Sequence, residues 1–323
     1  MRAFILAGGF ATRLWPLTER RAKPLLPLAG EPIIDHLIRH LHWDIPITVS
    51  INAAFEKGFL HWKEHGRHTN VEIVVENSLR EDQKLGALGA FAQWIERFDV
   101  HDDVLLLTGD NYCGFSFRDL LSHYTPGTPL IAAHNIGDIE HAKTFGTIVP
   151  AADSVHVEAF EEKPSQPRST LVSTGVSVLP AAHLPTAVEH AKEKPDNIGG
   201  LFEEFLRQNI PVEFRAFTEP WFDIGSFESY LAANSAIVGE KLLQAENTTC
   251  ENTQTHGTVV VGRHSAVRRS TLTNVILFEN CTVEDCILEN CILDDHCAVT
   301  SIDLKGQMLR EGTVLKGFCS RAE

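Results

Sequence analysis

A glycine turn followed by two basic residues lies close to the start of the chain. Gly8 and Gly9 follow the apolar run at residues 2–7, and Arg13 and Lys23 come after them. Adjacent glycines let the backbone turn tightly and direct N–H groups toward phosphate oxygens or the edge of a base. A guanidinium group adds a planar, bidentate phosphate partner. The spacing fits neither a P-loop nor a dinucleotide fingerprint, so it predicts another kind of phosphate site, with an ordinary basic turn as the alternative.

Two aspartates occupy positions suited to a divalent cation. Asp110 follows the apolar run at residues 104–108, and Asp223 ends the run Trp221-Phe222-Asp223. Carboxylate oxygens are ligands that Mg²⁺ prefers, and phosphate and water complete its octahedron. A turn-capping or helix-capping role could explain either aspartate alone. Because capping does not explain both together, we expect Asp110 and Asp223 to be Mg²⁺ ligands.

Strands that alternate with helices would position these groups. Apolar, β-rich runs at residues 2–7, 47–52, 71–76, 104–108 and 130–136 are separated by helical apolar spacing at residues 33–41 and 85–98. The alternation predicts an α/β fold, a Rossmann-like, mostly parallel sheet with helices on both faces. Ligands of such sheets bind beyond the carboxyl ends of the strands. From residue 146 we expect strands without intervening helices, at 146–149, 155–160 and 172–179, then a last strand at 212–217 and a helix over 227–243.

The C-terminal part of the chain has a different periodicity. Apolar residues recur there every five or six positions, with polar residues and turns between them. This repeat predicts a short parallel β-helix of three to four coils. The predicted organisation is a catalytic domain at residues 1–238, a linker at 239–254 and a hexapeptide-like β-helix domain at 255–323. Cys281, Cys286 and Cys291 follow the repeat, so we interpret them as small residues stacked in the coils.

Composition excludes several classes of protein. A formal net charge of −15 without a basic stripe argues against a general nucleic-acid binder, and no apolar run is long enough to span a bilayer. Seven cysteines are an odd number and too few for a disulfide framework, so we expect a reduced, cytoplasmic protein. The clustered histidines lack a third zinc ligand and are predicted to lie on exposed helix faces. They are His36, His40, His61, His65 and His68.

Six motifs resemble, in the same order, those of the sugar-1-phosphate nucleotidyltransferases, which include glucose-1-phosphate thymidylyltransferases and mannose-1-phosphate guanylyltransferases. They are the run from Gly8 through Thr18 to Lys23-Pro24-Leu25-Leu26-Pro27, Gly109-Asp110-Asn111, Phe145-Gly146, Glu161-Glu162-Lys163-Pro164, Thr174-Gly175 and Trp221-Phe222-Asp223-Ile224-Gly225. The C-terminal repeats resemble the left-handed β-helix of several members. The resemblance implies Mg²⁺-dependent transfer of a nucleoside monophosphate from a nucleoside triphosphate to a sugar 1-phosphate, with release of pyrophosphate.

The resemblance also implies roles for individual residues. Arg13 and Lys23 would bind the triphosphate and the departing pyrophosphate, and Lys163 would hold the attacking phosphate. The implied nucleotide-binding residues are Leu6, Gly8, Gly9, Ala11, Thr12, Gln83 and Gly86, and the implied sugar-phosphate-binding residues are Gly146, Glu162, Lys163, Thr174 and Gly175. The family usually has glycine in place of Ala11, whose Cβ narrows the permitted backbone or the space beside the base.

The substrates and two other functional classes stay open. Gly109-Asp110-Asn111 is similar to the thymidylyltransferase motif, so we expect glucose 1-phosphate with dTTP or UTP; the run at residues 84–90 looks closer to guanylyltransferases, so mannose 1-phosphate with GTP is the alternative. A non-catalytic regulatory subunit should lack one of the five proposed charged residues, and all five are present. An acyltransferase site in the β-helix would have only His264 and His296 as candidates. We expect a homo-oligomer, a dimer or tetramer.

Overall fold

The computed structural model describes residues 1–41, 44–66, 68–76 and 85–317. The chain forms two compact units, one of Met1–Phe10 with Ile34–Asp223 and one of Ala11–Ile33 with Ile224–Glu323. This division groups residues 224–238, as well as the segment after the glycine turn, with the C-terminal residues, whereas the predicted boundary lies at residue 238. No helix in the described ranges is long and apolar enough to cross a membrane.

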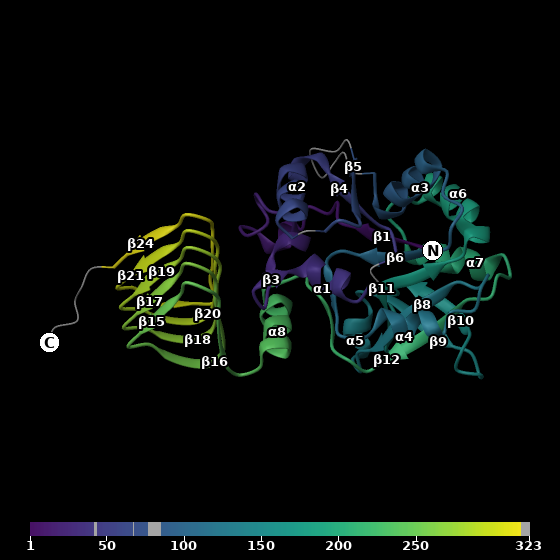
Figure 1. Ribbon diagram of the computed structural model, residues 1–323. Coiled ribbons are helices and arrows are strands. Elements are labelled where there is room, and N and C mark those ends of the chain that lie inside the picture. The colour runs from purple at the N-terminus through teal and green to yellow at the C-terminus, as the bar shows by residue number, and fades with distance from the viewer. Residues whose placement is uncertain (42–43, 67, 77–84, 318–323) are drawn as a thin grey trace. The chain divides into compact units, whose positions relative to one another are not determined.

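The first unit is built on a mixed sheet, of which nine strands lie in the described residues (Figure 1). Its centre is the parallel array β6-β1-β4-β5, as the strand-helix alternation predicted, and β11 pairs antiparallel with β6. The strands are β1 (Arg2–Leu6), β4 (Ile47–Asn52), β5 (Val71–Glu76), β6 (Val104–Thr108), β8 (Leu130–Asn135), β9 (Gly146–Pro150), β10 (Val157–Glu162), β11 (Leu171–Leu179) and β12 (Glu213–Phe217). The predicted α/β fold is confirmed.

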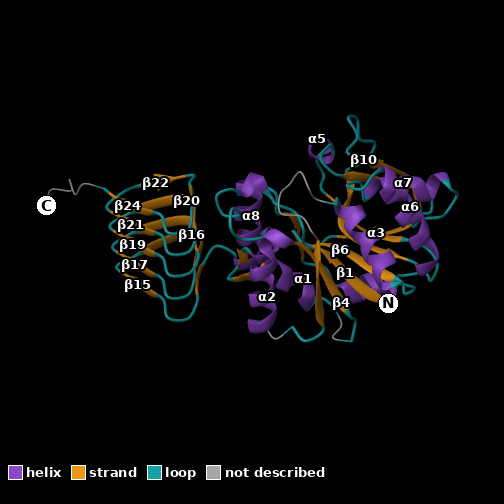
Figure 2. Ribbon diagram, turned by 90° about the horizontal axis from the view of Figure 1, so that it is seen from above, coloured by secondary structure: helices purple, strands orange, loops and turns teal. Residues whose placement is uncertain are grey.

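Helices lie on both sides of the central strands (Figure 2). They are α1 (Ile33–Arg39), α2 (Glu56–His65), α3 (Ala87–Phe98), α4 (Phe117–Ser122), α5 (Ile139–Ala142), α6 (Leu184–Glu193) and α7 (Gly199–Arg207). No helix intervenes between β9, β10 and β11, as expected, but α6 and α7, which lie between β11 and the last strand, β12, were not predicted. Leu184, Ala187 and Ala191 of α6 are buried at helical spacing, but this apolar face is too short to stand out in the sequence.

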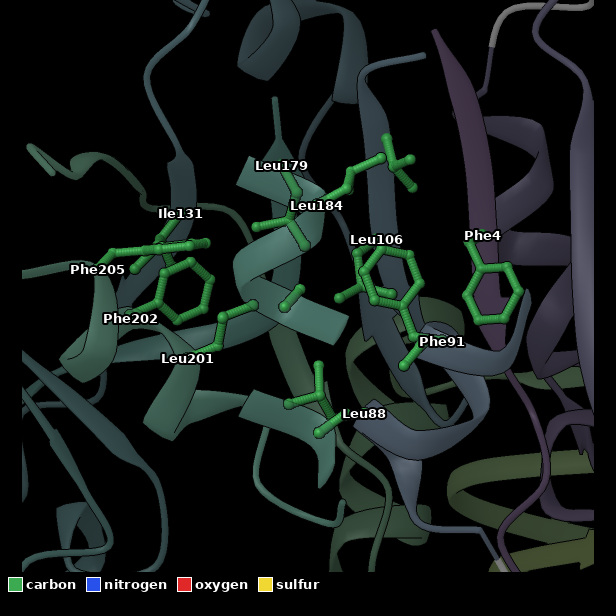
Figure 3. Packing of buried hydrophobic residues seen from close by; sticks show 14 of the residues in the cluster. Phe4, Leu88, Phe91, Leu106, Ile131, Leu179, Leu184, Leu201, Phe202 and Phe205 are labelled. Atoms are coloured by element: carbon green, nitrogen blue, oxygen red, sulfur yellow. The ribbon is translucent and has the colours of Figure 1, made fainter. Parts of the chain in front are cut away.

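The core of the first unit lies between the central strands and the helices α3, α6 and α7 (Figure 3). Phe4 of β1 and Leu106 of β6 face this core, and Phe91 of α3 packs on Phe4 with ring centroids 5.3 Å apart. Burial of each such side chain contributes roughly 1.5–3 kcal/mol. Ile5, which points to the opposite side of the sheet, is also fully buried. Because both faces are covered, these strands read as continuous apolar runs.

The second unit contains α8 and a parallel β-helix. Helix α8 (Phe227–Val238) begins with reciprocal hydrogen bonds between Ser226 and Ser229, which form a capping box. It ends at Gly239, whose φ of 77° leaves the helical region, so the helix is shorter than the predicted 227–243. The signal that ends it is therefore a glycine at the C-cap.

The β-helix repeats every sixteen residues, since Ala266, Thr282, Ala298 and Val314 are successive register partners. Its strands are β14 (Leu242–Gln244), β15 (Thr249–Glu251), β16 (Gln254–Val261), β17 (Ala266–Arg268), β18 (Thr271–Leu277), β19 (Thr282–Glu284), β20 (Ile287–Leu293), β21 (Ala298–Thr300), β22 (Leu304–Lys305), β23 (Met308–Leu309) and β24 (Val314–Lys316). The stacked parallel strands (Figure 2) are consistent with the predicted left-handed β-helix. Strands β14 and β15 lie in the predicted linker, because this outer coil is more polar than the coils behind it.

Cys281, Cys286 and Cys291 are buried inside the β-helix. Each follows a residue with positive φ, so the three thiols lie at successive turns of one coil. Stacking is instead from coil to coil: the main-chain N–H of Cys281 donates to Ser265 Oγ at 2.9 Å, one coil earlier. The prediction of small residues inside the coils is therefore correct for these three cysteines, but they do not stack on one another.

Candidate functional site

A two-stranded ribbon brings the two predicted metal ligands together in the first unit. β7 (Asn111–Cys113) pairs antiparallel with β13 (Trp221–Asp223), and Asp223 lies opposite Asn111. Directly opposed Cα atoms in such a ladder are about 4.5–5.5 Å apart. Asp110, the residue before Asn111, is therefore a neighbour of Asp223 at the end of this ribbon. Pairing across the fold, rather than spacing in the sequence, brings the backbones of these two residues close together.

Asn111 adds a further oxygen to this pair. Its side-chain amide donates to Asp110 Oδ1 at 2.9 Å and to Thr108 Oγ1 at 2.6 Å. Its own Oδ1 is buried and has no hydrogen-bond partner among the described residues, which marks a place for a ligand group or water. Two carboxylates and an amide oxygen suit Mg²⁺. The described ranges contain no group of three His, Cys, Asp or Glu residues that could hold a metal, so phosphate and water would complete the shell.

The glycine turn follows β1 at the carboxyl end of the parallel strands. The N–H of Gly109 donates to Leu6 O at 2.8 Å, which joins the end of β6 to that of β1. Gly8 O accepts from Asn52 Nδ2 at 2.8 Å. A Cβ on Gly8 would lie 2.9 Å from Glu76 Oε1, so a side chain here would displace the Glu76 carboxylate. Gly8 thus allows the turn to lie close to that carboxylate.

Two buried acceptors beside this turn are absent from the sequence prediction. Glu76 is 5% exposed and accepts from Ser50 Oγ at 2.8 Å, and burial raises the pKa of its carboxyl group. Asn52 is fully buried, and its Oδ1 lacks a partner within the described part of the chain. The two residues are register partners on β4 and β5. A polar residue in the last position of an apolar strand is the signal that could have identified both.

Three further residues in this part of the chain were predicted to bind the nucleotide: Gly9, Gln83 and Gly86. Gln83 lies outside the described residues. Gly86 has φ 81° at the start of α3, and a Cβ there would lie 2.5 Å from Pro195 O. This glycine is thus required where the helix packs on the chain around Pro195. Gly9 is exposed, and a Cβ there would meet no described atom within 4 Å, so only its backbone or its flexibility can account for it.

The predicted sugar-phosphate residues gather at the end of β10. The Glu162 carboxylate lies in the space beside Gly146 and Gly199, where a Cβ on either glycine would meet it. Burial raises the pKa of Glu162, and the neighbouring Glu203 adds to the rise while Lys163 opposes it. Lys163 Nζ lies 3.8 Å from Glu162 Oε1, and its side chain is 67% exposed. Gly199 and Glu203 belong to α7 and were missed because that helix was not expected.

Lys163 has an unusual backbone conformation. Its φ is 45°, and its N–H donates to Phe145 O at 3.1 Å. The left-handed region costs a non-glycine residue about 1–2 kcal/mol. Strain of this kind is concentrated at functional sites. The turn presents the Lys163 ammonium group to solvent directly after the Glu161-Glu162 segment, where a phosphate group can reach it.

Thr174 and Gly175 form a bulge in β11, where the register with β8 shifts. Gly175 has φ 76° and lies against Thr108, which leaves no room for a Cβ. The Thr174 hydroxyl is fully buried and donates to Ala132 O at 2.9 Å, and the Thr174 carbonyl accepts from Trp221 Nε1 at 3.1 Å. Thr174 therefore stabilises the bulge and offers no hydroxyl to a sugar, whereas Gly175 allows a close approach at the end of β6.

Residues 11–33 of the second unit, here called the signature loop, contain the other predicted phosphate ligands. The loop includes the short helices η1 (Thr12–Leu14) and η2 (Lys23–Leu25) and the strands β2 (Pro27–Leu28) and β3 (Glu31–Pro32). Ala11 has φ 48° and ψ 47°, a left-handed conformation that explains why glycine suits this position. Thr18 Oγ1 donates to Ala11 O at 2.8 Å. Arg13 is exposed, whereas Lys23 is only 6% exposed.

Residues 2–240 match the family model described as Nucleotidyl transferase. The chain belongs to the nucleotidyl transferase family. It is 29% identical over 241 residues to a putative mannose-1-phosphate guanyltransferase of Sulfolobus acidocaldarius, an alignment that covers 72% of this chain and 62% of that protein. It is 30% identical over 259 residues to a glucose-1-phosphate adenylyltransferase of Thermotoga maritima, which covers 73% and 60% of the two chains. The chain thus spans under two thirds of these relatives.

A solved structure has the same fold as this nucleotidyl transferase. It is the crystal structure of a putative glucose-1-phosphate thymidylyltransferase from Bacillus anthracis in complex with a sucrose. It superposes with a TM-score of 0.63 at 22% identity and covers 73% of this chain and 94% of its own. The resemblance to sugar-1-phosphate nucleotidyltransferases is confirmed. The names of the relatives differ in both base and sugar, so they do not assign the substrates.

The clustered histidines differ in exposure: His61 and His65 are exposed, His40 and His68 are half-buried, and His68 lies beyond the end of α2. The prediction of an exposed position is wrong for His36, which is 6% exposed and lies edge-on against Tyr112 at a centroid distance of 5.5 Å. The reason is that α1 packs this side against β7. His61 and His65 are exposed on α2, with ring centroids 3.9 Å apart.

Proposed function

We propose that this nucleotidyl transferase transfers a nucleoside monophosphate from a nucleoside triphosphate to a sugar 1-phosphate. The β7–β13 ladder supports the proposal most directly, because it pairs Asp223 with Asn111, the residue that follows Asp110. Both substrates are polyanions and repel one another. A divalent cation on two carboxylates, close to a glycine turn, is an arrangement that can hold a triphosphate for attack.

The reaction needs positioning more than proton transfer. An oxygen of the sugar phosphate attacks the α-phosphorus, a new P–O bond forms, and the bond between the α- and β-phosphates breaks. The electron pair leaves with pyrophosphate. Because the nucleophile is already an anion, no general base is required. The protein's contribution is to align the two phosphates and to stabilise the negative charge.

Each charged residue has a proposed role in this reaction. Asp110 and Asp223 would hold Mg²⁺, which supplies positive charge to the phosphates when it is bound. Arg13 and Lys23 bind the triphosphate and the departing pyrophosphate, and Lys163 holds the attacking phosphate. Glu162 is placed to accept a hydrogen bond from a sugar hydroxyl.

The proposed substrates are glucose 1-phosphate with dTTP or UTP, on the strength of the Gly109-Asp110-Asn111 motif. One observation favours the second candidate, mannose 1-phosphate with GTP. Asn52 Oδ1 and the Glu76 carboxylate are adjacent buried acceptors beside the glycine turn. Guanine presents two neighbouring donor groups to such acceptors, whereas thymine and uracil present one N–H between two carbonyl oxygens.

The test is a matrix of five nucleoside triphosphates against several sugar 1-phosphates, with Mg²⁺ present and pyrophosphate release recorded. Glu76→Gln is assayed beside the wild type, because it should weaken use of GTP more than use of dTTP or UTP if Glu76 contacts guanine. Release in no combination would refute the proposed activity and favour the regulatory subunit. The homo-oligomeric state and cytoplasmic location stay predictions, the first of which sedimentation can measure.

A further inference from the structure

Arg21 of the signature loop makes several contacts with the β-helix. Arg21 Nη1 lies 3.7 Å from Asp294 Oδ1, and Nη2 donates to Asp295 Oδ2. The Arg21 guanidinium carbon also lies 5.4 Å from the centre of the Phe278 ring. A planar guanidinium group can engage two carboxylates and an aromatic face at once, which an ammonium group cannot. One side chain of the loop therefore contacts three residues of the β-helix.

The carboxylates that hold Arg21 are themselves fixed. Asp295 Oδ1 accepts from the Glu279 N–H at 2.8 Å, one coil earlier, and Asp294 Oδ1 accepts from the Asp295 N–H at 2.8 Å. The side chains of Arg21 and Asp294 are 28% and 7% exposed. Since these charges are largely removed from water, loss of Arg21 leaves two neighbouring carboxylates poorly compensated. The contact is thus built to hold one geometry.

Weaker pairs flank this contact. Arg310 Nε lies 2.9 Å from Glu19 Oε2, and Arg20 Nη1 lies 3.9 Å from Glu311 Oε2. The Arg20 side chain is 77% exposed. An exposed pair at this distance contributes little, because water and salt screen it. Arg20 is therefore a matched control for its neighbour Arg21.

Helix α8 holds the far end of the signature loop. The Tyr230 hydroxyl, which is fully buried, donates to Pro27 O, and the Ala29 N–H donates to Asn234 Oδ1 at 2.8 Å. The loop is thus held at residue 21 by the β-helix and at residues 27–29 by α8. The phosphate ligand Lys23 lies between these two attachments.

Arg21 is followed directly by Ala22, the N-cap of η2. Ala22 is buried, and its carbonyl accepts from the Leu25 N–H at 2.9 Å, while Lys23 O accepts from the Leu26 N–H at 3.0 Å. We propose that Arg21 is a positioning residue through which the β-helix holds the phosphate-binding loop in its working conformation. Its effect on catalysis rests on the proposed function, but its effect on the loop does not.

The test compares Arg21→Ala with Arg20→Ala in the full-length chain. Hydrogen exchange at the Leu25 and Leu26 amides should become about tenfold faster or more in Arg21→Ala, since a hydrogen bond to a charged group contributes enough for such a factor. Arg20→Ala should match the wild type. In the pyrophosphate assay, Arg21→Ala should raise KM for the nucleoside triphosphate by a similar factor and leave KM for the sugar phosphate unchanged. Arg21→Lys keeps the charge but not the planar fork, so its exchange rates and its KM for the nucleoside triphosphate should lie between those of the wild type and Arg21→Ala.

The outcomes separate this proposal from the proposed function. Unchanged exchange at both amides in Arg21→Ala overturns the positioning role, whatever the activity. So does an equal rise in both KM values, which indicates a general loss of structure. Faster exchange in a protein whose wild type releases no pyrophosphate supports the positioning role and refutes the proposed activity. If Arg21→Ala does not fold, Asp295→Asn replaces it, because asparagine keeps the oxygen that binds the Glu279 N–H.

Discussion

Burial of the charged Asp294 carboxylate lowers the stability of the folded protein. Burial raises the pKa of its carboxyl group to about 6, although Arg21 opposes the rise, and its side chain is 7% exposed. A rise of about two units corresponds to about 3 kcal/mol between the two protonation states. Asp294→Asn keeps the shape and the acceptor for the Asp295 N–H but removes the charge. We expect it to be more stable than the wild type at neutral pH.

The sign follows from proton linkage. Because the pKa is higher in the folded than in the unfolded chain, the folded protein binds the proton more tightly. The stability contributed by the protonated group is complete below about pH 4 and is lost as the pH rises through about 6. The ionisable groups around Asp294 are Arg21 of the signature loop, Asp295 and Cys297 of its own coil, Glu311 of the next coil and Tyr230 of α8.

The assay is urea unfolding of both proteins between pH 4 and pH 7. The free energy of unfolding of Asp294→Asn minus that of the wild type should grow by about 2–3 kcal/mol over this range. Asp303→Asn is the matched control: its carboxylate also accepts a main-chain N–H in the β-helix, from Ile287 at 2.8 Å, but it is exposed and its charge stays hydrated. A difference that stays constant within 1 kcal/mol across the range would refute the desolvation of Asp294.

Three other substitutions test the site and its supports. Asp223→Asn should keep the fold and lower turnover about 10²–10³-fold, and an active variant in the pyrophosphate assay would contradict its role as a metal ligand. Lys163→Ala should raise KM for the sugar phosphate alone, while Lys192→Ala, 62% exposed on α6, should behave as the wild type. Gly175→Ala should destabilise the protein by more than the left-handed backbone cost of about 1–2 kcal/mol, because its Cβ would overlap the end of β6. Gly137→Ala, with φ 68° and no described atom within 4 Å, should show in urea unfolding the backbone cost alone.

The strands β4 and β6 could be predicted from sequence because they are buried on both sides. The apolar runs at residues 47–52 and 104–108 coincide with them, and the run at 71–76 coincides with the edge strand β5, on which Glu72 is exposed. Helix α3 was also foreseen, since its apolar face repeats over three turns. Helix α7 was not, because its apolar residues Leu201, Phe202 and Phe205 are too few to be distinguished from a strand.

The residue types of the site could be predicted from the sequence, but which of these residues lie close together could not. Asp110 and Asp223 each stand at the edge of an apolar run, but only the β7–β13 pairing brings their backbones close together. The acceptors Asn52 and Glu76 were missed because each reads as an ordinary strand end. Nothing local in the sequence shows that Arg21 pairs with carboxylates from the far end of the chain, since that contact depends on how the coils stack.

The attachment of the signature loop has a consequence for synthesis of the protein. Arg21 and Asp295 are 274 residues apart. At about 5–20 residues per second, a ribosome needs about 14–55 s to add the chain between them. The central strands can pair well before then, but the loop that holds Arg13 and Lys23 waits for a partner that is made 274 residues later. A nascent chain that has not yet reached Asp295 would thus form its sheet while its proposed triphosphate-binding loop is not yet fixed, and nucleotide binding would begin only after Asp295 is made.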